Sequence, residues 1–254
     1  MDPQPRAAAV RVIDLRDPLP HGRPTNDARL PAGDARLRRM TPADLPFVAT
    51  QHLHHFPDGF FARLGPAFLA EYYRPFLTGR HAHAYTVDVA GRPVGFLVGV
   101  THPVAHRQHV LRNHGRVLVV RAALSLLVRP RLALHFVRTR GRLYTRKMWV
   151  GRRTPPAAPV AVAERPAVLA HVVVAEGARS RGIGAALVER FVEDAAAAGC
   201  ARISLVTAAG HDGAGSYYAE RGWHAKGERS TPDGMRLATY ERPVPSPEAR
   251  RPGR

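Results

Sequence analysis

A short apolar run, followed by a glycine-containing turn and a long amphipathic stretch, constrains this chain more than any other feature. Residues 168–174 read Val-Leu-Ala-His-Val-Val-Val, which suits a buried β-strand. The turn after it contains Arg179-Ser180-Arg181-Gly182-Ile183-Gly184. From Ile183 to Ala198 apolar residues recur at helical spacing, and Gly199 is a natural helix end. The sequence therefore predicts a strand, a loop and a helix in succession.

The loop has the composition of an anion-binding site. Glycines at a helix start let a bulky anion approach the backbone, where the first helical amides and the helix dipole bind phosphate oxygens. Arg179 and Arg181 would add charge-assisted hydrogen bonds. Such a loop suits a ligand that carries a diphosphate. The alternative is a plain strand-to-helix turn in which the glycines serve packing.

Two nucleotide-binding motifs with similar turns do not fit. A Walker A loop requires Gly-Lys-Ser/Thr, and none follows here. The dinucleotide fingerprint requires a third glycine where Leu187 stands. It also requires an acidic residue about twenty positions later, where Arg202 stands. A Walker A loop is therefore excluded, and the dinucleotide fingerprint is incomplete.

The turn resembles the signature of the GNAT superfamily of acyl-CoA-dependent N-acyltransferases, Arg/Gln-x-x-Gly-x-Gly/Ala after a hydrophobic strand. Val174 to Arg179 also match the usual lead-in, although Glu176 stands where the family often has proline. Downstream, Ala214, Tyr218 and Gly222-Trp223 hold places of a second family pattern, in which His211 replaces asparagine.

The resemblance implies an α/β fold: a mixed, splayed β-sheet flanked by helices, with a basic helical insertion between the third and fourth strands. It covers about residues 36–103 and 164–243. The expected organisation is a disordered N-terminal arm (1–35), a GNAT-like acyltransferase domain (36–243) with a basic insertion and linker (104–163), and a flexible tail (244–254).

Local signals predict further elements. Thr41 to Asp44 look like a capped helix start with Pro42 at the first helical position. Other expected elements are a helix at 66–77, a hairpin of 82–90 and 93–100 turning at Gly91-Arg92, basic helices parted at Arg129-Pro130, strands at 203–207 and 236–242, and a helix at 214–221.

The resemblance also implies the site. The backbone of Val172, Val173 and Val174 would bind the acyl carbonyl and the pantetheine arm. The phosphates would lie on the amides of Arg179, Ser180, Arg181, Gly182, Ile183, Gly184 and Ala185. Tyr218 is the candidate catalytic residue, because a phenol can protonate a departing thiolate. Its alternative is an aromatic side chain packed under the sheet, beside Tyr217.

The general base stays open. His171 is the only ionisable side chain on the strand, but its alternation phase matches Val173, which favours a core or opposite-face histidine. Other candidates are His52, His54, His55 and His102, and no spacing favours one of them. No metal site is expected, because the histidine cluster at 52–55 has no carboxylate or cysteine beside it and Cys200 is the single cysteine.

The charged residues of this chain are mostly basic and are unevenly distributed along the sequence. The net charge is +18, and the stretch between Asp88 and Glu164 contains fourteen Arg and Lys residues without a carboxylate. Such a block favours anionic partners. It is either a solvated insertion that lines the acceptor cleft, or a surface that recruits an anionic acceptor or an anionic membrane. Arg112 and Arg116 share a helical face whereas Arg121 does not, which weakens the membrane reading.

These observations predict an N-acyltransferase that moves an acetyl or related acyl group from acyl-CoA to an amine by direct attack. Acetyl-CoA would be the donor, with no metal and no nucleic acid, and with peripheral membrane contact left open. The alternative is a catalytically degenerate scaffold that binds nucleic acid or an anionic membrane. A cytoplasmic protein is expected, because the N-terminus has no apolar stretch and the longest mostly apolar run, 117–128, is too short to span a bilayer.

Overall fold

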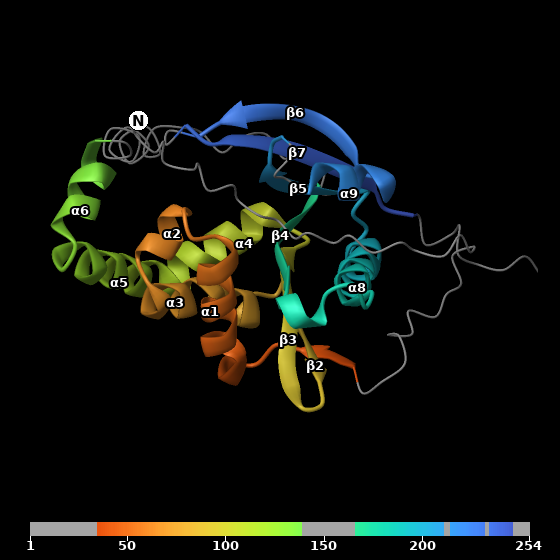
Figure 1. Ribbon diagram of the computed structural model, residues 1–254, viewed down its shortest axis with the longest axis horizontal. Helices are drawn as coiled ribbons and strands as arrows, with labels where there is room; N and C mark the ends of the chain where they lie inside the picture. The colour runs from red at the N-terminus through yellow and green to blue at the C-terminus, as the bar shows by residue number, and fades with distance from the viewer. Residues whose placement is uncertain (1–34, 139–165, 211–213, 232–233, 246–254) are drawn as a thin grey trace, which may run out of the picture.

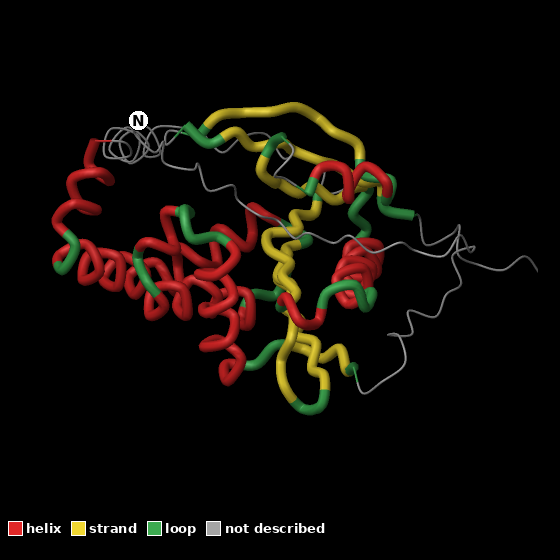
Figure 2. Tube along the Cα trace, viewed as in Figure 1, coloured by secondary structure: helices red, strands yellow, loops and turns green. Residues whose placement is uncertain are grey.

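The strands join one mixed sheet with helices on both faces (Figures 1 and 2). The computed structural model describes residues 35–138, 166–210, 214–231 and 234–245. Within them the strands are β1 (Arg36–Arg39), β2 (Ala82–Val89), β3 (Arg92–Val100), β4 (Ala167–Val174), β5 (Arg202–Ala208), β6 (His224–Ser230) and β7 (Arg236–Pro243). Their order in the sheet is β1-β2-β3-β4-β5-β7-β6, and all neighbours are antiparallel except β4 and β5.

The helices divide between the two faces. The α-helices are α1 (Leu45–His55), α2 (Phe60–Arg63), α3 (Pro66–Thr78), α4 (Pro103–His109), α5 (Gly115–Leu127), α6 (Pro130–Phe136), α8 (Ile183–Ala197) and α9 (Gly215–Glu220). A π-helical segment, η2 (Val110–His114), joins α4 to α5, and short 3-10 turns form η1 (Pro42–Asp44) and η5 (Glu176–Ala178). Figure 1 shows α1 and α3 on one side of β4 and α8 on the other.

Strand β4 contributes to two hydrophobic cores, because its side chains alternate between the faces. Val172 and Val174 pack in the core that α8 covers, whereas Val173 packs with Tyr73 of α3 on the opposite face. Helix α8 approaches the sheet so closely that a Cβ on Gly99 would lie 2.5 Å from the ring of Phe191. Only glycine fits at that point of β3.

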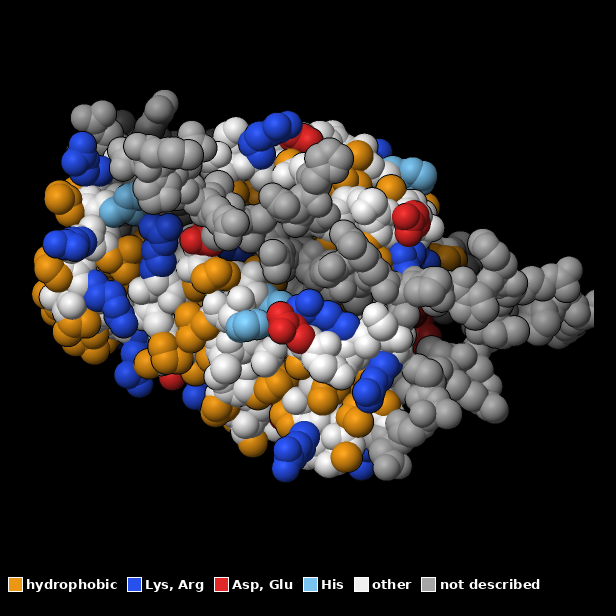
Figure 3. Space-filling view, viewed as in Figure 1, with side chains coloured by type: hydrophobic (Ala, Val, Ile, Leu, Met, Phe, Trp, Pro, Cys, Tyr) orange, Lys and Arg blue, Asp and Glu red, His pale blue; other side chains and the backbone are white. Residues whose placement is uncertain are grey.

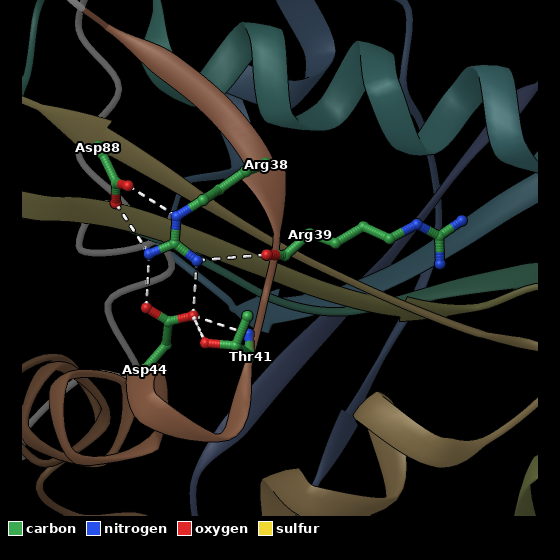
Figure 4. Close-up of polar contacts among 5 residues, drawn as sticks. All are labelled: Arg38, Arg39, Thr41, Asp44 and Asp88. Atoms are coloured by element: carbon green, nitrogen blue, oxygen red, sulfur yellow. Dashed lines mark hydrogen bonds and ion pairs between the residues drawn. The ribbon is translucent and has the colours of Figure 1, made fainter. Parts of the chain in front are cut away.

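An ion-paired arginine joins the edge strand β1 to the start of the first helix (Figure 4). Arg38 donates to both carboxylate oxygens of Asp44 at 2.7 Å and to Asp88 of β2 at 2.6 and 3.1 Å. Asp44 also accepts from the backbone amide of Thr41 at 2.7 Å. The hydrogen bonds from Arg38 lower the pKa of Asp44. The helix start expected at Thr41-Pro42 is confirmed.

The sheet splays open between β4 and β5. These parallel strands pair only at Ala167 with Ile203 and at Val168 with Ser204. Beyond Val168, β4 continues to Val174 alongside β3, while β5 continues alongside β7 over its whole length. One edge of β4 is therefore left without a neighbouring strand from Leu169 onward, and the expected mixed, splayed α/β fold is confirmed.

Most expected elements are found, and the differences have simple causes. The hairpin turns at Ala90-Gly91, one residue earlier than expected. Strand β6 escaped prediction because all of its residues are exposed, so it has no apolar alternation and depends on its pairing with β7. Strand β1, with the sequence Arg-Leu-Arg-Arg, gives a similarly weak signal.

The basic stretch after β3 is helical as far as the structure describes it. It breaks between α5 and α6 beside Arg129-Pro130, as expected. Its status as an insertion, and the domain boundaries, stay predictions. The expectations for the N-terminal arm up to residue 34, for the part of the basic insertion and linker at 139–163, for His211 and for the tail from 246 fall outside the described residues. No helix in the described part of the chain is long and apolar enough to cross a membrane.

Candidate functional site

The first turn of α8, which follows the loop after β4, presents amides that have no partner within the helix. Two of its residues, Ser180 and Gly182, have positive φ angles of 60° and 71°. The amide of Ala186 bonds to the carbonyl of Gly182 at 2.9 Å, which begins the helical ladder. The amides of Ile183, Gly184 and Ala185 precede that bond, so they have no partner within the helix. Together with the α8 dipole, they offer hydrogen-bond donors and positive potential at the start of the helix.

A pocket opens over this loop. Its lining comprises Val174, Ala178, Arg179, Ser180, Gly182, Ile183, Gly184, Ala185, Tyr217 and Arg221. Seven of the ten residues expected to bind the cofactor lie in it, whereas Val172, Val173 and Arg181 do not. The loop and the end of β4 thus meet in one concave site, and cofactor binding by these residues stays a prediction.

Helix α9 makes a contribution to the pocket that could not be predicted from the sequence. Arg221 stacks on the ring of Tyr217, with 3.7 Å between the guanidinium carbon and the ring centroid. Arg221 also donates to the Tyr217 carbonyl at 3.3 Å. These contacts bring a second arginine to the pocket beside Arg179. Only the two glycine-loop arginines stood out in the sequence, because the approach of α9 is a tertiary contact.

Arg179 connects the loop to β4 and to α1. Its Nε donates to the carbonyl of Val174 at 3.3 Å, and its Nη2 lies 2.7 Å from Nε2 of His55. Nδ1 of His55 lies 2.9 Å from the carbonyl of Gln51, which can only accept, so Nδ1 carries the proton and Nε2 accepts from Arg179. Burial, together with the charge of Arg179, lowers the pKa of His55. The neutral histidine thus anchors the guanidinium.

The open edge of β4 carries main-chain groups of two of the three valines. Ala175 donates to the carbonyl of Val94 on β3 at 2.7 Å. Because main-chain groups of successive residues point to opposite edges of a strand, those of Val172 and Val174 point away from β3. The carbonyl of Val174 accepts from Arg179, and the groups of Val172 face the gap toward β5. The main chain of Val173 points to β3 instead.

His171 lies on the face opposite Val172 and Val174, as its alternation phase predicted. Its ring lies 5.2 Å from that of His52 and 5.4 Å from that of Phe56, and Nε2 is 3.3 Å from the hydroxyl of Tyr72. Burial lowers the pKa of His171 to about 3 and that of His52 to about 4. Both histidines are therefore neutral near pH 7.

Tyr218 is fully buried. Its ring packs against Tyr217, Trp223 and Tyr240. Its hydroxyl has no hydrogen-bond partner among the described residues, and burial raises the pKa of the phenol. Tyr217, not Tyr218, lines the pocket over the loop. The catalytic role of Tyr218 stays a prediction. Among the described residues, no group of three or more histidine, cysteine or acidic side chains is placed to hold a metal ion.

Comparisons with known proteins agree with this geometry. Residues 146–223, which include the strand, the loop and α8, match the acetyltransferase (GNAT) family. No curated protein sequence matches the chain. Ard1 from Thermoplasma volcanium is 15% identical with a TM-score of 0.51, and the alignment covers 84% of this chain and 99% of that one.

Two further solved structures have the same fold. One, described only as an acetyltransferase, is 16% identical with a TM-score of 0.51, over 83% of this chain and all of that one. The other, SsHAT, is 19% identical with a TM-score of 0.50, over 84% of this chain and all of that one. Residues 146–223 thus match the acetyltransferase (GNAT) family over part of the chain, and the splayed sheet and the glycine loop support the resemblance to the GNAT superfamily.

Proposed function

We propose that this protein transfers an acetyl group from acetyl-CoA to an amine by direct attack of the amine on the thioester. The observation that carries the proposal is the meeting of two features in one pocket: the open edge of β4 and the amide-lined start of α8. Acyl transfer to an amine is the general activity of the superfamily. The degenerate-scaffold alternative has no support in the comparisons.

The loop is suited to the diphosphate of CoA. The amides of Ile183, Gly184 and Ala185 and the α8 dipole offer hydrogen bonds and positive potential. Gly182, with its positive φ, leaves the backbone uncovered by a side chain. Arg179 and Arg221 add positive charge to the same pocket. A ligand with two phosphate groups uses all of these features at once.

The pantetheine arm would bind along the open edge of β4. Its amide groups need main-chain partners, and the groups of Val172 face the gap where β5 diverges. Val172 and Val174 pack in the α8 core, and each is 1% exposed as a whole residue. The two valines would therefore pack the core and bind the donor through their backbone at the same time.

Tyr218 would assist departure of the thiolate. In the reaction the amine nitrogen forms a bond to the acetyl carbon, the carbon–sulfur bond breaks, and the sulfur leaves with the electron pair. The amine gives up a proton and the sulfur takes one. The buried hydroxyl of Tyr218 has no partner among the described residues, and its raised pKa keeps it protonated as a hydrogen-bond donor. Positioning of the amine against the thioester would supply much of the remaining acceleration.

Calorimetry and thermal unfolding test the donor site. CoA and acetyl-CoA should bind and raise the melting temperature, because a ligand at about 100 times its Kd adds about 2.7 kcal/mol of stability. Pantetheine, which has no diphosphate, should bind much more weakly. The transfer itself is measured as thiol release from acetyl-CoA in the presence of a panel of amines. Absence of any stabilisation by acetyl-CoA would overturn the proposal.

A further inference from the structure

Exposed apolar side chains are concentrated in one segment of the molecule. Of the eleven large hydrophobic residues that are exposed in the described chain, ten lie between residues 104 and 137, and the other is Val206 on β5. The most exposed are Leu127 at 77%, Val128 at 74% and Val119 at 68%. Single exposed apolar residues are ordinary, but a concentration of this kind marks an interaction surface. The exposed side chains of residues 104–137 are called the α5 surface below.

Helix α5 is apolar on both of its sides. Leu118, Ala122 and Leu126 recur at four-residue spacing and are partly buried, on the side that faces the protein. Val117, Val120, Leu124 and Leu127 recur at i, i+3, i+7 and i+10, and all four are exposed. No residue of α4, η2 or α5 is fully buried. A helix that is apolar all round is stable where a second apolar phase covers its outer side.

The same surface is strongly positive. Seven arginines lie between residues 107 and 138, each of them exposed, and the sequence has no carboxylate from 89 to 163. Arg116 and Arg121 flank the apolar stripe of α5. Figure 3 shows orange and blue side chains interspersed at the end of the molecule where Figure 1 places α5 and α6. Long arginine side chains can keep their charge at a polar boundary while their stems cover apolar surface.

We propose that the α5 surface docks the protein on an anionic membrane, with Val117, Val120, Leu124 and Leu127 entering the headgroup boundary and the arginines binding lipid phosphates. Apolar insertion and basic charge together are what an anionic bilayer surface recognises. A nucleic acid would use the arginines but would leave the apolar stripe without a partner. The contact is peripheral, in keeping with the lack of a membrane-crossing helix among the described residues.

Docking in this way leaves the candidate site accessible. Helix α5 packs on α3, which covers the same face of the sheet as α1, whereas α8 and its loop lie across the sheet (Figure 1). The docked enzyme would hold its donor loop away from the bilayer. Membrane binding and donor binding are thus separate properties, and each can be measured without the other.

Vesicle cosedimentation tests the proposal with the full chain. The vesicles are phosphatidylcholine alone, or phosphatidylcholine with about 30 mol % phosphatidylglycerol. The wild-type protein should sediment with the anionic vesicles and not with the neutral ones, and added salt should weaken binding. Absence of sedimentation with the anionic vesicles would overturn the proposal.

Two variants separate the apolar from the electrostatic contribution. One carries Val120→Ser, Leu124→Ser and Leu127→Ser, and the other carries Arg112→Glu, Arg116→Glu and Arg121→Glu. Each should bind anionic vesicles at least tenfold more weakly than the wild type. A matched control with Arg92→Glu and Arg229→Glu, both exposed on strands, should bind as the wild type does. Stabilisation by acetyl-CoA should be unchanged in all three, which also shows that each is folded.

Other outcomes would assign the surface differently. If the serine variant bound anionic vesicles as tightly as the wild type, the contact would depend on charge alone. The proposed entry of apolar side chains into the headgroup boundary would then be wrong. Light scattering shows whether the wild type is a dimer that the serine variant converts to a monomer, in which case the surface is an interface between two copies. Equal or tighter binding to a DNA or RNA duplex than to anionic vesicles, lost in the arginine variant, would assign it to nucleic acid.

Discussion

Nη2 of Arg179 lies 2.7 Å from Nε2 of His55, although the two residues are 124 positions apart in the sequence. The pair joins the loop before α8 to the end of α1, past the last residue of β4. His55 accepts because its own proton is donated to Gln51. The guanidinium of Arg179, which lines the pocket, is therefore held by a side chain from the opposite face of the sheet.

Removal of this acceptor should weaken donor binding. In His55→Leu, Arg179 loses a hydrogen bond worth about 1 kcal/mol, so CoA affinity measured by calorimetry should fall roughly fivefold. His55→Gln keeps an oxygen that can accept from the guanidinium and should bind CoA nearly as the wild type does. Equal affinity in the leucine variant would mean that Arg179 needs no anchor.

Gly182 tests the diphosphate site directly. Gly182→Asp places a negative charge and a side chain at the loop, so CoA affinity should fall at least tenfold through repulsion. Gly182→Asn is the matched control, since it has the same shape and a similar tolerance for positive φ but no charge. The asparagine variant should lose less affinity than the aspartate variant. Equal losses would point to strain at φ +71° as the cause.

Tyr218→Phe separates catalysis from packing. Turnover should fall roughly 100-fold, the lower range for general acid–base contributions. The free energy of unfolding should hold or rise, because the change removes a buried hydroxyl that has no partner among the described residues. Tyr217→Phe, on the adjacent residue that lines the pocket, is the comparison and should keep most of its turnover. Full turnover in Tyr218→Phe would return Tyr218 to a packing role.

Stability should decrease in mild acid because of buried neutral histidines. His52 is 3% exposed, and burial lowers its pKa to about 4, well below 6.5. Its contribution is fully present above pH 6.5 and is lost as the pH falls toward 4, because only the unfolded chain takes up the proton in that window. At about 1.4 kcal/mol per pKa unit, the full loss is about 3.5 kcal/mol.

Urea midpoints at pH 7 and pH 5 measure this effect. His52→Asn keeps a polar partner for the hydroxyl of Tyr73, which lies 2.7 Å from Nδ1 of the histidine, and should reduce the loss of stability between the two pH values. His54→Asn, on the exposed side of the same helix, controls for helix propensity. An unchanged pH dependence in His52→Asn would exclude His52 as its source.

The strand, loop and helix around the candidate site could be predicted because their signals are local. The apolar run to Val174, the glycines of the loop and the helical spacing after Ile183 each fall within a few residues. Strand β6 could not be predicted, since an exposed strand that depends on β7 has no apolar periodicity. The placement of Arg221 over Tyr217 was equally hidden, because it depends on how α9 meets the loop.

The parting of β4 and β5 could be expected only from the resemblance to the family, and not from the residues of the two strands. Nothing in the sequence of β4 or β5 reveals that their pairing stops after Val168. The alternation phase that His171 shares with Val173, by contrast, correctly predicted that the histidine lies on the face opposite Val172 and Val174, where it contacts His52 of α1. Periodicity therefore predicts which face a side chain occupies, whereas it does not predict where two strands part.

The sheet consists of two hydrogen-bonded units that are joined only by two residue pairs between β4 and β5, which form a short seam. On one side of the seam β1 to β4 form a continuous hydrogen-bonded unit, and on the other β5 to β7 form a second. A donor molecule lodged in the gap would hydrogen-bond to β4 where a strand is missing. The relative position of the two units would then depend on whether the donor is bound. The protection of amides along the seam from solvent exchange would change with it.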